Sequence, residues 1–182
     1  MKHIHLSALA FFLIGLISCG EGKKEAVENE KNWKTLNEKN YSIHYPESWE
    51  VDNSGKMGMS FMLLSKLTTD KDEVRENVNL LVQDLPGGKM SLDKYVEISE
   101  GQIKSVISNA SIIESTRENS DEFEYHKVLY TGDEGENKFK FEQHIYIKNG
   151  KAYVLTLTCE LDQFDKYKED GEKILNSFRF SK

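Results

Sequence analysis

Three residues in the second half of the chain, His126, Glu142 and His144, have the side chains of a metal site. Two imidazoles and one carboxylate are ligands that zinc accepts in proteins. If the acidic turn at 134–136 pairs its flanking strands so that His126 faces His144, all three side chains lie on one sheet face. A one-residue change of register would separate them. The alternative is that the histidines lie under a helix edge with ordinary hydrogen bonds.

Cys159 is a second candidate for chemistry, because a thiol beside a histidine can act as a nucleophile. It ends an apolar run, however, where cysteine usually behaves as a small buried hydrophobe. The chain contains no Gly-x-Ser-x-Gly, His-Glu-x-x-His, paired Cys-x-x-Cys or Gly-x-x-x-x-Gly-Lys motif. We therefore expect a protein that is not an enzyme, has no catalytic residues and binds no cofactor.

Two other kinds of segment have both a structural and a functional interpretation. The acidic stretches 70–73 and 133–136 lack the ligand spacing of an EF-hand, so we interpret them as exposed loops rather than calcium sites. Four aromatic residues near the start of the domain could line a groove for a peptide or a lipid, and core packing is the interpretation that we favour: Tyr41, Tyr45, Trp49 and Phe61.

The pattern of apolar residues predicts a chain of strands interrupted by two helices. The strands are expected at 33–36, 41–45, 59–64, 78–82, 123–131, 138–147 and 151–160, with another beginning near 112. Ser91 is expected to cap a first helix that ends near Asn109, and Asp162 to cap a second helix that carries apolar residues to Phe178.

The dipeptide Asn149-Gly150 predicts a two-residue hairpin turn, because both positions of a type I′ turn need positive φ. This turn places Ile147 opposite Ala152 and Ile145 opposite Val154. Both faces of the resulting sheet are then partly apolar, whereas a sheet with one solvated face alternates more cleanly. We therefore predict an α+β fold, an α/β/α sandwich whose mostly antiparallel sheet is flanked by helices.

Several motifs, in their order along the chain, resemble the PsbP-like family, which includes photosystem II subunit P and DcrB-type bacterial lipoproteins. They are Tyr41-Ser-Ile-His-Tyr-Pro-Glu-Ser-Trp49, Asn77-Val-Asn-Leu-Leu-Val-Gln-Asp84, Ser91-Leu-Asp-Lys-Tyr95 and Ile174-Leu-Asn-Ser-Phe178. The resemblance spans residues 33–180. It implies an α/β/α sandwich and a non-catalytic binding or assembly factor. The photosystem's metal and halide sites are not carried over, because no motif here matches them.

The N-terminal segment has the pattern of a bacterial lipoprotein leader. Residues 6–17 are almost wholly apolar, which is too short for a transmembrane helix and typical of a signal-peptide core. Leu16-Ile17-Ser18-Cys19 resembles the lipobox, in which the cysteine is acylated and becomes the new N-terminus. We expect a signal peptide at 1–18, the lipidated Cys19 with a polar tether at 19–32, and the PsbP-like domain at 33–182.

The composition and net charge of the chain limit the kinds of partner that it can bind. The chain is 38% hydrophobic and 30% charged, as in a globular protein, and its net charge of −7 disfavours nucleic acid. We expect a cell-envelope protein that faces the periplasm, attached to a membrane through Cys19, with an envelope protein as partner. Gly20 replaces the retention Asp that some bacteria use, which favours the outer membrane over the inner one. The alternatives are a small-molecule or metal-binding sensor and an enzyme of unrecognised type.

Overall fold

The computed structural model describes residues 32–67, 74–119 and 123–182. The leader, Cys19, nearly all of the tether and the acidic stretch 70–73 lie outside these residues. The described elements are β1 (Trp33–Asn37), β2 (Tyr41–Pro46), β3 (Glu50–Asp52), η1 (Lys56–Gly58), β4 (Met59–Leu64), β5 (Asn77–Asp84), η2 (Pro86–Gly88), α2 (Leu92–Val106), β6 (Ser108–Asn119), β7 (Glu124–Glu134), β8 (Asn137–Lys148), β9 (Lys151–Glu160), α3 (Phe164–Asn176) and β10 (Arg179–Phe180).

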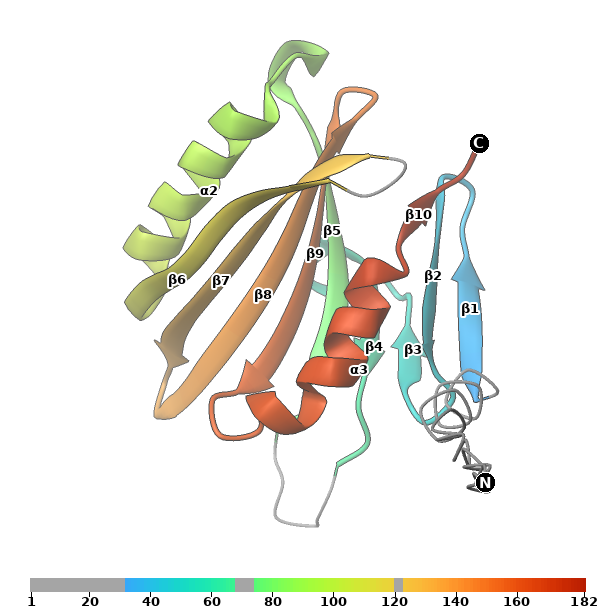
Figure 1. The fold of residues 1–182 in the computed structure, drawn as a ribbon, viewed down its shortest axis with the longest axis vertical. Helices are drawn as coiled ribbons and strands as arrows, with labels where there is room; N and C mark the ends of the chain where they lie inside the picture. The colour runs from blue at the N-terminus through green and yellow to red at the C-terminus, as the bar shows by residue number, and fades with distance from the viewer. Residues whose placement is uncertain (1–31, 68–73, 120–122) are drawn as a thin grey trace, which may run out of the picture. The chain divides into compact units, whose positions relative to one another are not determined.

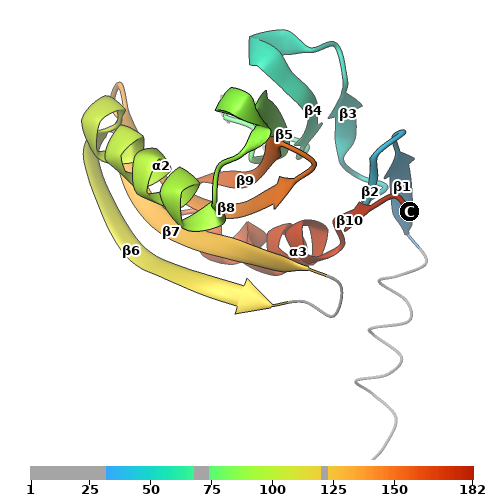
Figure 2. The ribbon, with the colours of Figure 1, turned by 90° about the horizontal axis from the view of Figure 1, so that it is seen from above.

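Seven strands form a large antiparallel sheet in the order β3-β4-β5-β9-β8-β7-β6, and β1, β2 and β10 form a small one. Helix α2 packs on one face of the large sheet over β6, β7 and β8, and α3 packs on the other face over β9 and β5 (Figures 1 and 2). The predicted α+β fold with helices on both sides of a mostly antiparallel sheet is confirmed. None of the helices in the described residues combines the length and apolarity needed to cross a membrane.

The two helices begin in different ways. The Ser91 side chain accepts a hydrogen bond from the Lys94 amide at 3.2 Å, so the predicted cap of α2 is confirmed. The predicted cap of α3 by Asp162 is wrong. Residues 161–163 form a turn in which the Gln163 amide bonds to the Glu160 carbonyl, and the helix begins only at the buried Phe164.

Each face of the large sheet has its own hydrophobic core. The larger core lies under α3 and reaches the small sheet, and the smaller one lies under α2. Tyr41, Tyr45, Trp49 and Phe61 all belong to the larger core, and none is more than 9% exposed. Their interpretation as packing residues is confirmed, and the open aromatic groove is excluded for these four side chains.

Gly171 gives a direct test of how tightly α3 packs. A Cβ at this position would lie 2.5 Å from Cδ2 of the fully buried Leu157, so Gly171→Ala should destabilise the protein by about 1–3 kcal/mol. Gly101 on α2 is the control, because a Cβ there meets no atom within 4 Å and Gly101→Ala should stabilise the helix by about 0.5–1 kcal/mol. Urea unfolding of the full-length variants measures both. Equal stability of the two variants would contradict this packing.

Candidate functional site

The register of β7 and β8 decides which side chains meet. A two-residue turn at Gly135-Glu136 pairs Glu134 with Asn137, and this places His126 opposite Ile145. Paired residues of an antiparallel ladder lie on the same face. The predicted register is therefore wrong by one residue. His126 lies on the α2 face, whereas Glu142 and His144 lie on the α3 face, and the predicted metal trio is divided by the sheet.

His126 joins a polar contact between α2 and the sheet. Its Nε2 lies 2.7 Å from the Ser115 hydroxyl, which donates to the Glu100 carboxylate at 2.6 Å. In a Ser-His-Asp triad the acid contacts the histidine. Here Glu100 contacts the serine, and Nδ1 of His126 has no hydrogen-bond partner among the residues that the structure describes. Burial, assisted by the charge of Arg117, lowers the pKa of His126 against the opposing pull of Glu100 and Asp93. The arrangement attaches α2 to β6 and β7.

Glu142 and His144 form a buried pair under α3. The His144 Nε2 atom lies 2.9 Å from the Glu142 carboxylate, and the side chains are 2% and 3% exposed, respectively. The ammonium group of Lys127 lies 3.8 Å from the same carboxylate. Burial alone would raise the pKa of Glu142. The hydrogen bond from His144, electrostatic attraction to that ring, and the positive charges of Lys127 and Lys168 together outweigh burial, so the pKa of Glu142 lies below its usual value.

One nitrogen of this pair lacks a partner. Nδ1 of His144 is buried and has no hydrogen bond to any described residue. The ring packs against Tyr125 with 4.6 Å between centroids, which supports its orientation but satisfies no polar atom. Buried polar atoms are usually hydrogen-bonded, so this nitrogen is an exception among the described residues.

The pair lies in a cavity of about 250 Å³ between α3 and the strands β6, β7 and β8, which we call the acidic cleft. Its lining is Glu118, Tyr125, Lys127, Glu142, His144, Glu172 and Asn176. It contains three carboxylates and one ammonium group. Among the described residues, no three His, Cys, Asp or Glu side chains are arranged to hold a metal ion. The cleft therefore has the chemistry of a hydrogen-bond acceptor for a cationic group.

Sequence reasoning found Glu142 and His144 but missed the rest of the cleft. Glu118 and Lys127 lie on neighbouring strands, and Glu172 and Asn176 come from α3. These residues have no shared spacing in the sequence, because only the docking of α3 on the sheet brings them together. Lys127 could have been placed on the same sheet face as Glu142, because side chains alternate between the two faces along β7. This placement needed the correct position of the turn at 135–136.

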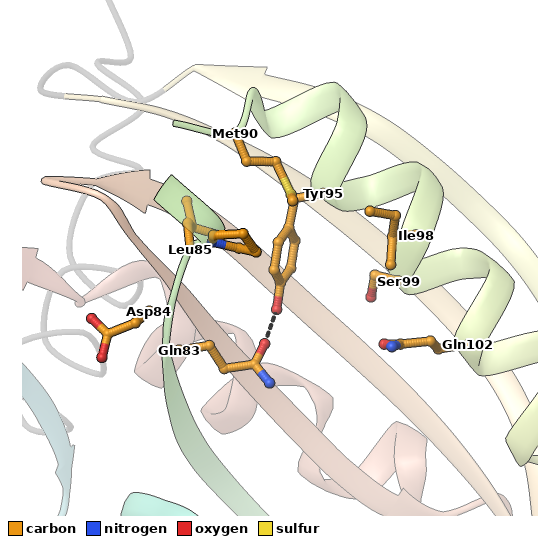
Figure 3. Close-up of a pocket in the computed structure, with 9 residues that line it drawn as sticks. Gln83, Asp84, Leu85, Met90, Tyr95, Ile98, Ser99 and Gln102 are labelled. Atoms are coloured by element: carbon orange, nitrogen blue, oxygen red, sulfur yellow. Dashed lines mark hydrogen bonds between the residues drawn. The ribbon is translucent and has the colours of Figure 1, made fainter. Parts of the chain in front are cut away.

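A second cavity of about 190 Å³ lies between the end of β5 and α2, and we call it the α2 cleft. The Tyr95 hydroxyl reaches from the helix to donate a hydrogen bond to the Gln83 side chain (Figure 3). The apolar part of the lining is Leu85, Pro86, Met90 and Ile98, and the polar part is Gln83, Asp84, Ser99 and Gln102. Ile98 is 39% exposed. Among the described residues that line this cleft, no two side chains form a buried charged pair like that of Glu142 and His144.

Cys159 lies in the core under α3 and is fully buried. Burial, with a smaller contribution from Glu76, raises the pKa of its thiol to about 12. A reactive cysteine needs a thiolate, which the surroundings here disfavour. The interpretation of Cys159 as a packing residue is the one that the geometry supports.

Comparison with known proteins agrees with this fold. The family model described as PsbP matches residues 31–180. No curated protein sequence matches the chain.

Three solved structures share the fold at low sequence identity. The solution structure of CyanoP, the cyanobacterial PsbP of Synechocystis sp. PCC 6803, is 18% identical with a TM-score of 0.62, over 91% of this chain and 99% of CyanoP. LpqN of Mycobacterium tuberculosis, described as involved in cell envelope biogenesis, is 9% identical with a TM-score of 0.60. The match covers 86% of this chain and 96% of LpqN. PA94 of Pseudomonas aeruginosa, described as a protein of unknown function and putative regulator, is 9% identical with a TM-score of 0.57. The match covers 80% of this chain and 95% of PA94.

Replacing Glu142 tests the buried pair through its pH dependence. Because the pKa in the folded protein is below 4.5, the carboxylate stabilises the fold fully above that pH, and this contribution is lost as the pH falls through the lowered value. Glu142→Gln should reduce stability at neutral pH by about 1–3 kcal/mol, and the difference from wild type should shrink between pH 5 and pH 3. Urea unfolding at each pH measures it.

Glu97→Gln is the control for this series, because the Glu97 side chain is 70% exposed and forms a surface ion pair with Lys94 on α2. Its stability should stay within about 0.5 kcal/mol of wild type at every pH. A loss in Glu142→Gln that is constant from pH 5 to pH 3 would show that the ionised carboxylate is not what stabilises the pair.

Proposed function

This chain belongs to the PsbP family, and from that premise we propose that it is a lipid-anchored protein of the bacterial cell envelope whose domain binds or helps to assemble a protein partner. The observation that carries the proposal is the order of its parts. An apolar leader-like segment is followed by Leu16-Ile17-Ser18-Cys19, which resembles a lipobox, then by a short polar segment and then by the family domain. We further propose that the outer membrane carries the anchor and that the domain faces the periplasm.

The physics of anchoring supports this location. Each buried CH₂ of an acyl chain contributes about 0.8 kcal/mol to membrane binding, so two or more chains hold a protein firmly. The segment 20–32 is charged and has almost no apolar residues, which suits a solvated tether between lipid and domain. LpqN, which shares the fold, is described as involved in cell envelope biogenesis, and that description agrees with an envelope role here.

The arrangement of the reactive side chains supports a non-catalytic role. The thiol of Cys159 is buried with a raised pKa, and the Ser115 hydroxyl contacts an acid and a histidine in an order unlike that of a hydrolase triad. Cys159 packs in the core under α3, and the contacts of Ser115 attach α2 to the sheet. The net charge of −7 also supports a protein or membrane partner rather than nucleic acid.

A small-molecule or metal sensor is the second candidate, and the acidic cleft is the observation in its favour. Sites for drug-sized ligands usually enclose about 300–1,000 Å³ and are mostly apolar. The acidic cleft is smaller, at about 250 Å³, and is lined mainly by polar groups. Its size fits one side chain of a partner better than a whole metabolite, so we place the binding module first.

Metabolic labelling tests the anchor. Radiolabelled palmitate should enter the wild-type protein and be absent from a Cys19→Ala variant, because the lipobox thiol is the proposed acylation site. The labelled protein should also fractionate with outer rather than inner membranes. Equal label in the two proteins, or none in wild type, would contradict the proposed anchor.

In-cell crosslinking tests the binding role. The tagged wild-type protein should capture the same envelope protein reproducibly, and Cys19→Ala should capture much less, because loss of the anchor removes the domain from the membrane surface. Mass spectrometry identifies the captured protein. Crosslinking that yields no partner above the Cys19→Ala control, at equal protein levels, would contradict the proposal.

A further inference from the structure

We infer that the acidic cleft binds a guanidinium group, presented by an arginine side chain of the protein partner. The inference rests on the proposed function and names the chemistry of the partner at one site. Four features of the cleft carry it: an unpaired buried nitrogen, an excess of carboxylates, the shape set by α3, and the size of the cavity.

In the neutral form of His144, the second ring nitrogen is a hydrogen-bond acceptor. The Glu142 carboxylate accepts from Nε2, so a neutral imidazole has its proton on Nε2 and a bare lone pair on Nδ1. The His144 side chain is 2% exposed and lines the cleft, and no described group donates to Nδ1. A ligand that brings N–H groups into the cleft would satisfy this acceptor.

The charges of the cleft favour a cation as this donor. The cleft is lined by Glu118, Glu142 and Glu172 and by one ammonium group, that of Lys127, which lies 3.8 Å from Glu142. Lys127 is also 4.0 Å from Glu114, so its charge is shared with a carboxylate outside the cleft. Glu172 pairs at 3.7 Å with Lys168, whose side chain is 51% exposed, and such exposed pairs contribute little. A positively charged ligand would therefore bring the net charge of the cleft closer to zero.

The two walls of the cleft favour a guanidinium over a compact ammonium or a metal ion. Glu118 belongs to β6, Glu172 and Asn176 belong to α3, and Glu142 and His144 form the buried floor on β8. A planar guanidinium has five N–H donors that spread toward several acceptors at once. A metal ion would need closer ligands than the described residues offer. A cavity of about 250 Å³ accepts the end of one arginine side chain.

Calorimetric titration of the full-length protein in detergent tests the inference. The probe is Nα-acetyl-arginine amide, and the control probe is Nα-acetyl-citrulline amide, which has the same shape without the positive charge. The arginine probe should bind at least about tenfold more tightly, and its affinity should fall as salt is added. Equal affinity of the two probes, or no binding of the arginine probe, would overturn the inference.

Two substitutions on α3 locate the binding. Glu172→Gln removes a carboxylate of the cleft and should weaken binding of the arginine probe by about two- to fivefold. Glu169→Gln is the matched control, because Glu169 is 78% exposed, pairs with Lys173 and lies outside the cleft lining. Both positions are on the surface of the helix, so both variants should fold. Equal effects of the two substitutions would overturn the location.

A further titration distinguishes the source of the guanidinium and separates this inference from the proposed function. The peptide acetyl-Gly-Arg-Gly-amide should bind at least as tightly as free agmatine if the group belongs to a protein chain. Agmatine binding without peptide binding would overturn the protein source. If Glu172→Gln still crosslinks the envelope partner at the wild-type level, the cleft inference fails while the proposed function stands.

Discussion

The register of the central strands is the constraint on which the site depends. Tight two-residue turns at Gly135-Glu136 and Asn149-Gly150 hold β8 between β7 and β9 with no freedom to slip. This register places Glu142 and His144 under α3 and His126 under α2. Both faces are buried by helices, so a slip of one residue would move charged groups into the smaller core and apolar groups into the cleft. Packing on the two faces therefore reinforces what the turns determine.

The buried pair is stable because several interactions offset its burial. Removing a carboxylate from water is unfavourable, and the lowered pKa of Glu142 shows that the hydrogen bond from His144 and the nearby cations more than compensate. Leu155 and Leu157, which pair from β9 with His144 and Glu142, belong to the apolar core under α3, and burial of apolar surface is the dominant favourable contribution to folding. Such a pair contributes little net stability, and it gives the face a polar site at a defined position.

Local chemistry determined which parts of the fold the sequence could predict. Ser91 and Asn149-Gly150 were predictable because a cap and a type I′ turn depend on adjacent residues. The acidic segment 133–136 is compatible with more than one hairpin turn. The turn that forms pairs Glu134 with Asn137, and this register separates His126 from Glu142 and His144. The approach of Glu172 to Glu118 depends on α3 docking across the sheet, and no local pattern encodes it.

Imidazole ¹⁵N NMR of the full-length protein at neutral pH would show directly whether the buried pair leaves an unfilled acceptor on His144. We expect His144 to carry its proton on Nε2, bonded to Glu142, with an unprotonated Nδ1 that accepts no hydrogen bond. A proton on Nδ1, or a signal showing that Nδ1 already accepts a strong hydrogen bond, would contradict it.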